Sequence, residues 1–362
     1  MTAPTQSALL DALKNVTDPN TGRDFVSGKQ LRNLQVEGGD VSFDVELGYP
    51  AKSQVPALRS ALIAAARSVP GVQNVSVQIA TKVVAHAAQR GVQLLPKVKN
   101  IVAVASGKGG VGKSTTAVNL ALALRALGWN VGLLDADIYG PSQQVMLGVA
   151  EGTRPGQQDG QHLLPVEAHG LKTMSMGYLV TERTPMVWRG PMAGGALAQM
   201  LEQTLWGDLG CLVIDMPPGT GDIQLTLSQK AKVAGAVIVT TPQDIALMDA
   251  QKGIEMFRKV DIPILGVVEN MAVHICSNCG HQEHIFGAEG GRRIAREYGV
   301  PLLGSLPLAL SIREQTDSGR PTVVAEPASP VTAIYLEIAG AIQAQLETAA
   351  AGEFPTINIS DD

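Results

Sequence analysis

Two periods of hydrophobic and polar positions alternate in residues 1–82, which predicts a small α+β domain. The segments "QSALLDALKNV" and "VPALRSALIAAARSV" space their apolar residues three and four positions apart, as amphipathic helices do. The segments "VSFDVEL" and "GVQNVSVQIA" alternate apolar and polar residues, as half-buried strands do. We therefore predict a domain over residues 1–82, followed by a polar and basic linker over residues 83–99.

The pattern changes from residue 100, where short apolar runs alternate with helical stretches. The runs are "IVAVAS", "NVGLLDAD", "CLVIDMP", "AVIVTTP" and "ILGVVEN". Apolar runs of this kind are typical of strands buried on both faces of a doubly wound, mostly parallel sheet. Each run ends in polar residues, and such sheets bind ligands beyond the carboxyl ends of their strands. We predict an α/β domain over residues 100–345 and a loosely held acidic tail over residues 346–362.

Composition narrows the class of protein. Hydrophobic residues make up 45% of the chain and charged residues 17%, which favours a sizeable core over disorder. The net charge of −5 gives no basic footprint for nucleic acid. Neither a run of about 18 apolar residues nor a secretory signal is found in the sequence. The chain has three cysteines, an odd number, and two of them, Cys276 and Cys279, form a C-x-x-C pair. This pattern favours a metal or redox role in a reducing compartment over a set of disulfides. We expect a cytoplasmic protein that binds neither membrane nor nucleic acid.

The segment "SGKGGVGKST" carries the clearest chemistry. Residues 107–114 fit G-x-x-x-x-G-K-[ST] between a predicted strand and a predicted helix, the context that this phosphate-binding loop requires. Backbone N–H groups and the helix N-terminus would surround phosphate oxygens, Lys113 would reach the β- and γ-phosphates, and Ser114 would ligate Mg²⁺. The alternative is a chance glycine-rich turn. We predict ATP and Mg²⁺ as cofactors, bound by Gly107, Lys108, Gly109, Gly110, Val111, Gly112, Lys113, Ser114 and Thr115.

Carboxylates at neighbouring strand ends fit the same site. Asp215 ends an apolar strand, where it could hold Mg²⁺ through water, and the N–H of Gly219 could contact the γ-phosphate. Asp135 and Asp137 end another strand and could orient the attacking water, although an aspartate there can also cap a helix. We predict a slow ATP hydrolase. Its predicted catalytic residues are Lys108, Lys113, Asp135 and Asp137.

Several motifs together resemble a known family. "GKGGVGKST" is similar to the deviant Walker A loop of the ParA/MinD/Mrp ATPases. "DADIYGPS", "MSMGYL", "WRGPM", "DMPPGTGD", "VVENM" and "CSNCG" resemble the Mrp/ApbC iron–sulfur cluster carriers over residues 98–345. The resemblance implies a homodimer in which Lys108 reaches the partner's nucleotide. It also implies that Asn270 hydrogen-bonds the adenine edge and that Pro307 lies beside the base. A solvated loop lysine and a turn asparagine are the simpler alternatives.

The C-x-x-C segment "VHICSNCGHQEH" predicts a metal site. Two chains related by a two-fold axis would bring four thiolates from Cys276 and Cys279 to a bridging [4Fe–4S] cluster, as the resemblance implies. Alternatives are a Cys₂His₂ zinc site with His281 and His284, a zinc ion bridged between chains, or a redox dithiol. Cys211 begins an apolar strand and is most simply a core thiol.

Residues 8–82 resemble the MIP18-type domain through "VTDPNTGRDFVSGKQL". Domains of that type often carry a cysteine where this chain has "LGYPAKSQVP", so we interpret the domain as a docking or regulatory module. The resulting hypothesis is an ATP-dependent carrier that transfers an iron–sulfur cluster to apoproteins. The alternatives are a zinc-bridged targeting ATPase and a ParA/MinD-like positioning ATPase. The acidic tail, unlike a basic amphipathic helix, does not favour membrane positioning.

Overall fold

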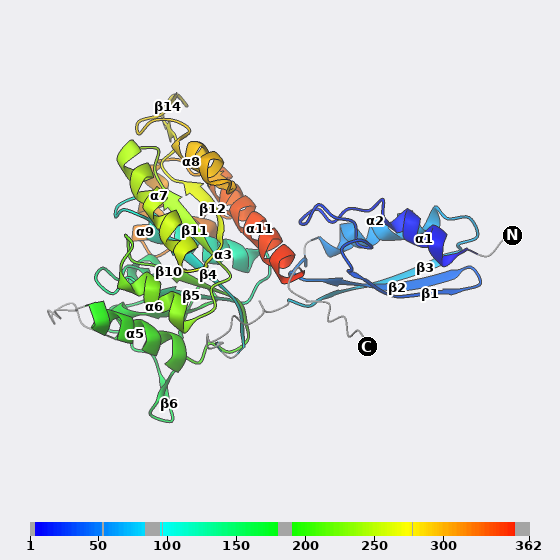
Figure 1. The fold of residues 1–362 in the computed structure, drawn as a ribbon, viewed down its shortest axis with the longest axis horizontal. Helices are drawn as coiled ribbons and strands as arrows, with labels where there is room; N and C mark the ends of the chain where they lie inside the picture. The colour runs from blue at the N-terminus through cyan, green and yellow to red at the C-terminus, as the bar shows by residue number, and fades with distance from the viewer. Residues whose placement is uncertain are drawn as a thin grey trace, which may run out of the picture. The chain divides into compact units, whose positions relative to one another are not determined.

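The computed structural model describes residues 4–52, 54–83, 95, 97–179, 190–276 and 278–351. The chain divides into two compact units, of which the smaller contains residues 1–84 and 343–362 and the larger residues 85–342 (Figure 1). Most of the predicted linker and the first two residues of "WRGPM" lie outside the described residues.

The small unit is a three-stranded sheet packed against two helices, as the four predicted elements indicated. Strand β1 runs antiparallel to β2, and β2 runs parallel to β3. The alternating side chains Val41, Phe43, Val45 and Leu47 of β2 are buried. Strand β1 was not predicted, because a register shift between Arg32 and Gln35 breaks its alternation. The elements are α1 (Gln6–Leu13), β1 (Leu31–Glu37), β2 (Asp40–Leu47), α2 (Val55–Arg67) and β3 (Asn74–Thr81).

A buried polar cluster ties the end of the last helix, α11 (Pro330–Ala351), into the small unit. Gln30 donates from Nε2 to Asp18 Oδ2 at 3.2 Å and to Glu347 Oε1 at 2.9 Å. The hydroxyl of Tyr49 donates to Asp18 Oδ1 at 2.8 Å. Residues 346–351, which we predicted to begin a tail, are therefore helical.

The large unit is built on an eight-stranded sheet, which confirms the predicted fold class. Its strand order is β15-β12-β11-β4-β10-β5-β9-β8, and every neighbouring pair is parallel except β8 and β9. The five predicted runs form the adjacent strands from β12 to β5. The strands are β4 (Val98–Ala105), β5 (Val131–Asp135), β8 (Val166–Ala168), β9 (Leu171–Ser175), β10 (Leu209–Asp215), β11 (Gly235–Thr240), β12 (Ile264–Glu269) and β15 (Leu302–Ser305).

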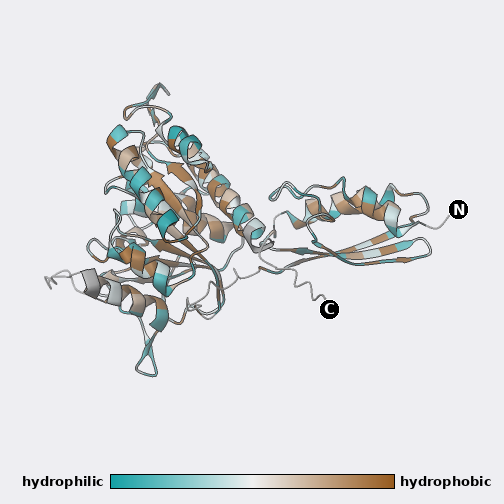
Figure 2. Ribbon diagram, viewed as in Figure 1, coloured by the Kyte–Doolittle hydropathy of each residue, from teal (hydrophilic) through white to brown (hydrophobic). Residues whose placement is uncertain are grey.

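Helices cover the sheet, and its strands are the most hydrophobic part of the ribbon (Figure 2). The helices are α3 (Lys113–Ala126), α4 (Gln143–Met146), α5 (Gly190–Gln203), α6 (Asp222–Lys230), α7 (Asp244–Lys259), α8 (Gly290–Tyr298), α9 (Leu310–Asp317) and α10 (Thr322–Ala325), with a 3₁₀ turn, η1 (Met176–Tyr178). Two small hairpins pair β6 (Gln157–Gln158) with β7 (His162–Leu163) and β13 (His274–Ile275) with β14 (Gln282–Glu283). All six residues of β11 are buried, as a central parallel strand requires.

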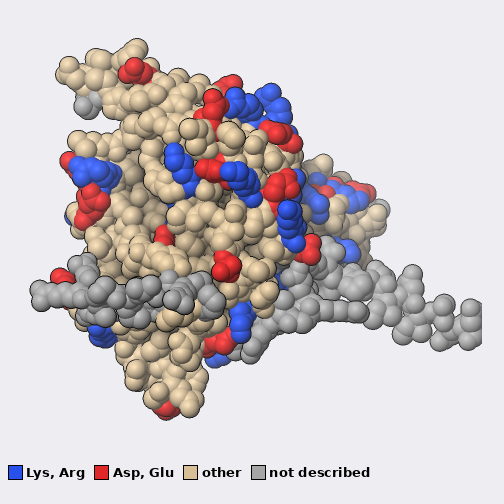
Figure 3. All heavy atoms as spheres, turned by 60° about the vertical axis from the view of Figure 1, so that its left-hand side comes forward, with Lys and Arg blue, Asp and Glu red and all other residues tan. Residues whose placement is uncertain are grey.

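The surface gives two further observations. Across the described residues, no helix combines the length and the apolar character needed to span a membrane. On the face shown in Figure 3, blue Lys and Arg side chains are interspersed with red Asp and Glu side chains. That face therefore presents mixed charge.

Candidate functional site

The phosphate loop lies between β4 and α3, and its glycines occupy positions that a side chain would disturb. A Cβ atom on Gly107 would lie 2.0 Å from the carbonyl oxygen of Asp249 on α7. Gly112 has a φ of +79°, and a Cβ there would lie 2.1 Å from Nδ2 of Asn270. The loop can pack this closely against α7 and β12 only with glycine at these two positions.

Lys113, Ser114 and Asp215 meet at the carboxyl end of the sheet. The Nζ atom of Lys113 forms an ion pair with Asp215 Oδ1 and lies 3.0 Å from Ser114 Oγ. The Lys113 side chain is 6% exposed and that of Asp215 is fully buried, so each charge depends on the other for compensation. The Ser114 hydroxyl and a carboxylate oxygen of Asp215 thus both contact Lys113 Nζ, and oxygens of these two kinds are a donor set that fits Mg²⁺.

Asp135 is buried and holds the segment that follows β5. Its carboxylate accepts hydrogen bonds from the N–H groups of Asp137 at 3.1 Å, Ser142 at 3.0 Å and Gln143 at 3.0 Å. The hydroxyl of Ser175 on β9 also donates to it, at 3.0 Å. Burial and the nearby Asp215 raise the pKa of Asp135 to about 7. These bonds make Asp135 an anchor for the loop.

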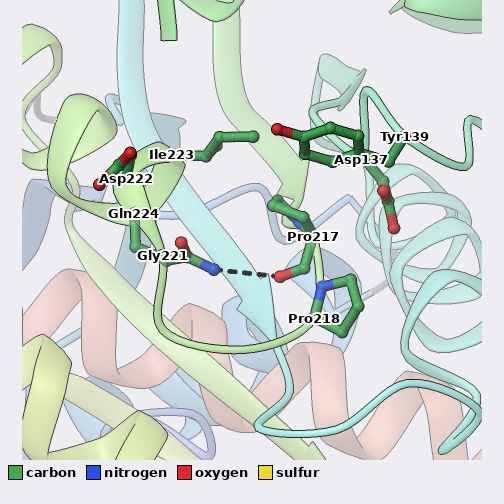
Figure 4. Close-up of a pocket in the computed structure, with 8 residues that line it drawn as sticks. All are labelled: Asp137, Tyr139, Pro217, Pro218, Gly221, Asp222, Ile223 and Gln224. Atoms are coloured by element: carbon green, nitrogen blue, oxygen red, sulfur yellow. Dashed lines mark hydrogen bonds between the residues drawn. The ribbon is translucent and has the colours of Figure 1, made fainter. Parts of the chain in front are cut away.

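Asp137, by contrast, lines an open cleft of about 460 Å³ (Figure 4). Burial raises its pKa, the charge of Lys113 lowers it, and that of Asp215 raises it. Asp137 and Tyr139 stand on one side of the cleft; Pro217, Pro218, Gly221, Asp222, Ile223 and Gln224 complete the lining. Of the two aspartates predicted to orient water, Asp137 is the one that faces open space.

The loop after β10 is fixed by hydrogen bonds to neighbouring segments. Gln224 donates from Nε2 to the carbonyl oxygens of Pro217 at 3.1 Å and Gly219 at 2.9 Å. The N–H of Gly219, which we predicted to contact a γ-phosphate, donates to Ser106 O at 2.9 Å. This contact would have to be exchanged for the predicted one when nucleotide binds.

The structure places Asn270 against the phosphate loop. Its Nδ2 donates to the carbonyl oxygen of Val111 at 2.9 Å, so the amide group braces the loop from the end of β12. Its predicted contact with adenine stays a prediction, as does the position of Pro307 beside the base. Lys108 is exposed, and its carbonyl oxygen accepts a hydrogen bond from Ser106 Oγ at 2.9 Å. An exposed lysine at this place is compatible with the predicted contact to a partner chain.

The two cysteines lie in the turn between β13 and β14. Cys276 donates its N–H to His281 O at 2.9 Å, and Gly280 donates to Cys276 O at 2.9 Å. Backbone hydrogen bonds from Cys279 and Asn278 lower the pKa of the Cys276 thiol, with a smaller contribution from the Cys279 side chain. The turn therefore favours the thiolate, which is the form that binds metals.

The part of the chain that the structure describes does not assemble a complete metal site at the cysteines. Within the described residues, no group of three or more His, Cys, Asp or Glu side chains is placed to hold a metal ion. The Nδ1 atom of His284 lies 2.7 Å from the carbonyl oxygen of Ala272, and that of His274 lies 3.2 Å from Leu308 O. The structure does not bring His281 and His284 to the cysteines as a Cys₂His₂ group. Burial raises the pKa of Cys211 to about 12, which fits a core thiol.

Three polar residues at the site were not predicted from the sequence: Gln143, Ser175 and Gln224. Each acts through hydrogen bonds to residues that folding brings near. Gln143 directly follows "DADIYGPS" and Ser175 lies within "MSMGYL", so the motifs marked their segments but not their contacts. Gln224 stands in a helix start with no distinguishing pattern.

Comparisons with known proteins agree with this geometry. The family model described as NUBPL iron-transfer P-loop NTPase matches residues 97–343, and one described as iron–sulfur cluster assembly protein matches residues 6–79. The chain is 65% identical over 269 residues to the iron–sulfur cluster carrier protein of Pseudomonas fragi, covering 74% of this chain and 94% of that protein. It is 46% identical over 346 residues to the carrier protein of Haemophilus influenzae, covering 96% and 93%.

Solved structures are similar in the larger unit. A nucleotide-binding protein from Archaeoglobus fulgidus, in complex with ADP, has a TM-score of 0.57 at 38% identity, covering 66% of this chain and 92% of that one. The cell division ATPase MinD of Pyrococcus furiosus shares the fold, with a TM-score of 0.51 at 23% identity, covering 67% and 98%. With its phosphate loop, its strand order and the match over residues 97–343, the chain belongs to the NUBPL iron-transfer P-loop NTPase family.

Proposed function

We propose that the chain is an ATP-dependent carrier that binds a [4Fe–4S] cluster between two copies of itself and delivers it to apoproteins. The observation that carries the proposal is that one chain holds both a phosphate loop and two thiols near the surface, the half-buried Cys276 and the exposed Cys279. Relatives from two bacteria are named iron–sulfur cluster carrier proteins. Delivery from one protein to another requires a cargo site at the surface, where these thiols lie.

ATP hydrolysis would take place between the phosphate loop and the cleft. Ser114 and Asp215 would hold Mg²⁺, which supplies charge compensation for the phosphates. Lys113 would exchange its ion pair with Asp215 for the β- and γ-phosphates. Asp137 would orient the attacking water from the open side, while buried Asp135 keeps the loop in place. Lys108 of a second chain would compensate further negative charge, so hydrolysis would require the dimer.

The cluster would be cargo held by two chains. Each chain supplies two thiols, whereas a cubane cluster takes four thiolates. A two-fold axis through the hairpins would bring Cys276 and Cys279 of both chains together. The lowered pKa of the Cys276 thiol supports binding without a strong base.

A short path connects the two sites. Asn270 braces the phosphate loop at Val111, and Cys276 follows it by six residues. Between them, Ala272 donates to Leu306 O at 2.9 Å, so the segment is held against the end of β15. A shift of the loop on nucleotide exchange would therefore reach the cysteine hairpin through a short, hydrogen-bonded stretch. This cycle would take place in the cytoplasm, where reducing conditions keep the thiols of Cys276 and Cys279 available to bind a cluster.

Anaerobic reconstitution with iron and sulfide tests the proposal. We expect a broad visible absorbance band, an EPR signal after reduction, and about four irons and four sulfides per dimer. The matched variant Cys276→Ala/Cys279→Ala should lose all three, whereas Cys211→Ala should retain them. Wild-type protein that takes up zinc alone would overturn the cluster proposal and favour the zinc-bridged targeting ATPase.

A further inference from the structure

Gln143 lies where the loop after β5 meets the predicted magnesium ligands. It is the first residue of α4, and its side chain is 1% exposed. From Nε2 it donates to the carbonyl oxygen of Ser114 at 3.1 Å and to Asp215 Oδ2 at 2.8 Å. One amide group thus contacts the backbone of one predicted ligand and the carboxylate of the other.

The two oxygens of Asp215 have different partners. Oδ1 pairs with Lys113, whereas Oδ2 accepts the hydrogen bond from Gln143. When Lys113 turns to the phosphates, Oδ1 becomes available to a metal-bound water, but the bond from Gln143 to Oδ2 can remain. The amide would then keep the carboxylate from rotating, because a carboxylate held at one oxygen has a fixed direction for the other.

The backbone of Gln143 ties the same residue to the loop that carries Asp137. Its N–H donates to Asp135 Oδ2 at 3.0 Å, and that carboxylate also accepts from the N–H of Asp137. The side chain of Gln143 contacts Asp215 at the end of β10, and its backbone contacts Asp135 at the end of the neighbouring strand β5. Gln143 therefore connects Asp215 with the loop that carries Asp137.

The amide oxygen of Gln143, Oε1, is the remaining polar atom of the side chain and can accept a further hydrogen bond. Oε1 of Gln143 is buried and accepts no hydrogen bond from the described residues. Buried amide oxygens normally have a donor. A water molecule bound to Mg²⁺ would be such a donor.

We propose that Gln143 is a positioning residue that holds Asp215 for Mg²⁺ and couples the filled metal site to the loop of Asp137. The proposal rests on nucleotide hydrolysis at the phosphate loop and is independent of the cluster cargo. Failure of cluster reconstitution would therefore not contradict the role of Gln143. A normal Mg²⁺ titration of the Gln143 variants would likewise not contradict the carrier proposal.

The test compares Gln143→Met with Gln144→Met. Methionine keeps the length and unbranched shape of glutamine but removes the N–H donors. The neighbouring Gln144 donates to the carbonyl oxygen of Ala150 at 3.0 Å, away from Asp215, and serves as the control. The full-length protein is titrated with a fluorescent ADP analogue, once in EDTA and once over a series of Mg²⁺ concentrations.

For Gln143→Met we expect the affinity in EDTA to stay within about twofold of wild type. The Mg²⁺ concentration that gives half of the magnesium effect should rise about tenfold, which is the effect of losing one hydrogen bond to a charged group. The same shift should appear in the Mg²⁺ dependence of ATP hydrolysis. Gln144→Met should match wild type in both titrations.

Equal weakening with and without Mg²⁺, or an unchanged Mg²⁺ titration, would overturn the proposal and leave Gln143 as a packing residue. Thermal unfolding would show whether Gln143→Met folds, and a second variant keeps the test possible if it does not. Gln143→Asn keeps the amide but shortens its reach by one methylene, and it should show the same selective loss of the Mg²⁺ effect. A normal Mg²⁺ titration in that variant would also contradict the proposal.

Discussion

At the scale of residues, the two lysines of the phosphate loop differ most in their surroundings. Lys113 is 6% exposed and paired with Asp215, whereas Lys108 is exposed. A buried lysine serves both folding and binding, because its removal leaves a carboxylate uncompensated. An exposed lysine can be removed with little effect on the fold, so any effect on activity reports its chemistry.

Substitution of each lysine by methionine should separate these roles. We expect Lys113→Met to abolish ATP hydrolysis and to lower the free energy of unfolding by about 3 kcal/mol, since Asp215 loses its partner. Lys108→Met should change that free energy by less than about 0.5 kcal/mol and retain ATP binding, yet lose most of the hydrolysis. Urea unfolding and phosphate release measure the two effects.

The same two lysine variants can also contradict these expectations. Hydrolysis at the wild-type rate by Lys108→Met would make this lysine a solvated loop residue. Wild-type stability of Lys113→Met would show that another group compensates the charge of Asp215.

Motifs predicted which residues meet at the site, but not every contact. Lys113, Ser114 and Asp215 were predicted as neighbours because a phosphate loop and a strand end have fixed places in a parallel sheet. Asn270 and Val111 are 159 positions apart, and their hydrogen bond depends on how closely β12 approaches the loop. The bond from Gln143 to Asp215 spans 72 positions and follows no local pattern.

At the scale of elements, central strands were easier to predict than edge strands. A strand buried on both faces is a continuous apolar run, as the six residues of β11 show. Strand β8 has three residues of mixed exposure, and β1 contains a register shift, so neither has a readable period. Helix α11 continues past residue 345, where we predicted the α/β domain to end, because Glu347 has a partner in Gln30 and, through it, Asp18.

The last turns of α11 should make stability depend on pH. Burial and the charge of Asp18 raise the pKa of Glu347 from 4.5 to about 7 in the folded chain. The folded state therefore binds this proton more tightly than the unfolded chain does. The stabilisation is complete below about pH 4.5 and is lost as the pH rises through about 7.

We expect Glu347→Gln to reduce the fall in the free energy of unfolding between pH 5 and pH 8 by about 1–2 kcal/mol, a value lowered for partial solvent screening. Unfolding curves at several pH values measure the difference from wild type. The exposed Glu337, on the same helix, gives the control variant Glu337→Gln. Parallel curves for wild type and Glu347→Gln would show that Glu347 carries its charge freely in the folded state.

At the scale of the whole molecule, the central question is whether one chain or two hold the cargo. The described residues of one chain offer two thiols at the hairpin and no larger metal-binding group. A shared site and a single-chain site give different results when active and inactive chains are mixed.

A mixing experiment should decide between a shared site and a single-chain site. Wild-type chains are mixed with an equal amount of Cys276→Ala/Cys279→Ala chains and allowed to exchange subunits. A bridging cluster forms only in dimers of two wild-type chains, so cluster content should fall to about a quarter of the wild-type value. A site within one chain would leave about half. Iron analysis and absorbance after anaerobic reconstitution measure the content, and a tagged variant confirms that subunits have exchanged.

The hydrogen bond from Gln30 to Glu347 has a consequence for the order of folding. It joins residues 317 positions apart, although the sheet and both helices of the small unit are complete by residue 81. During synthesis the ribosome must therefore release the chain through Glu347 before this polar cluster can close. Until then Gln30 lacks the acceptor on Glu347, so the small unit can be completed only after the larger unit has been synthesised.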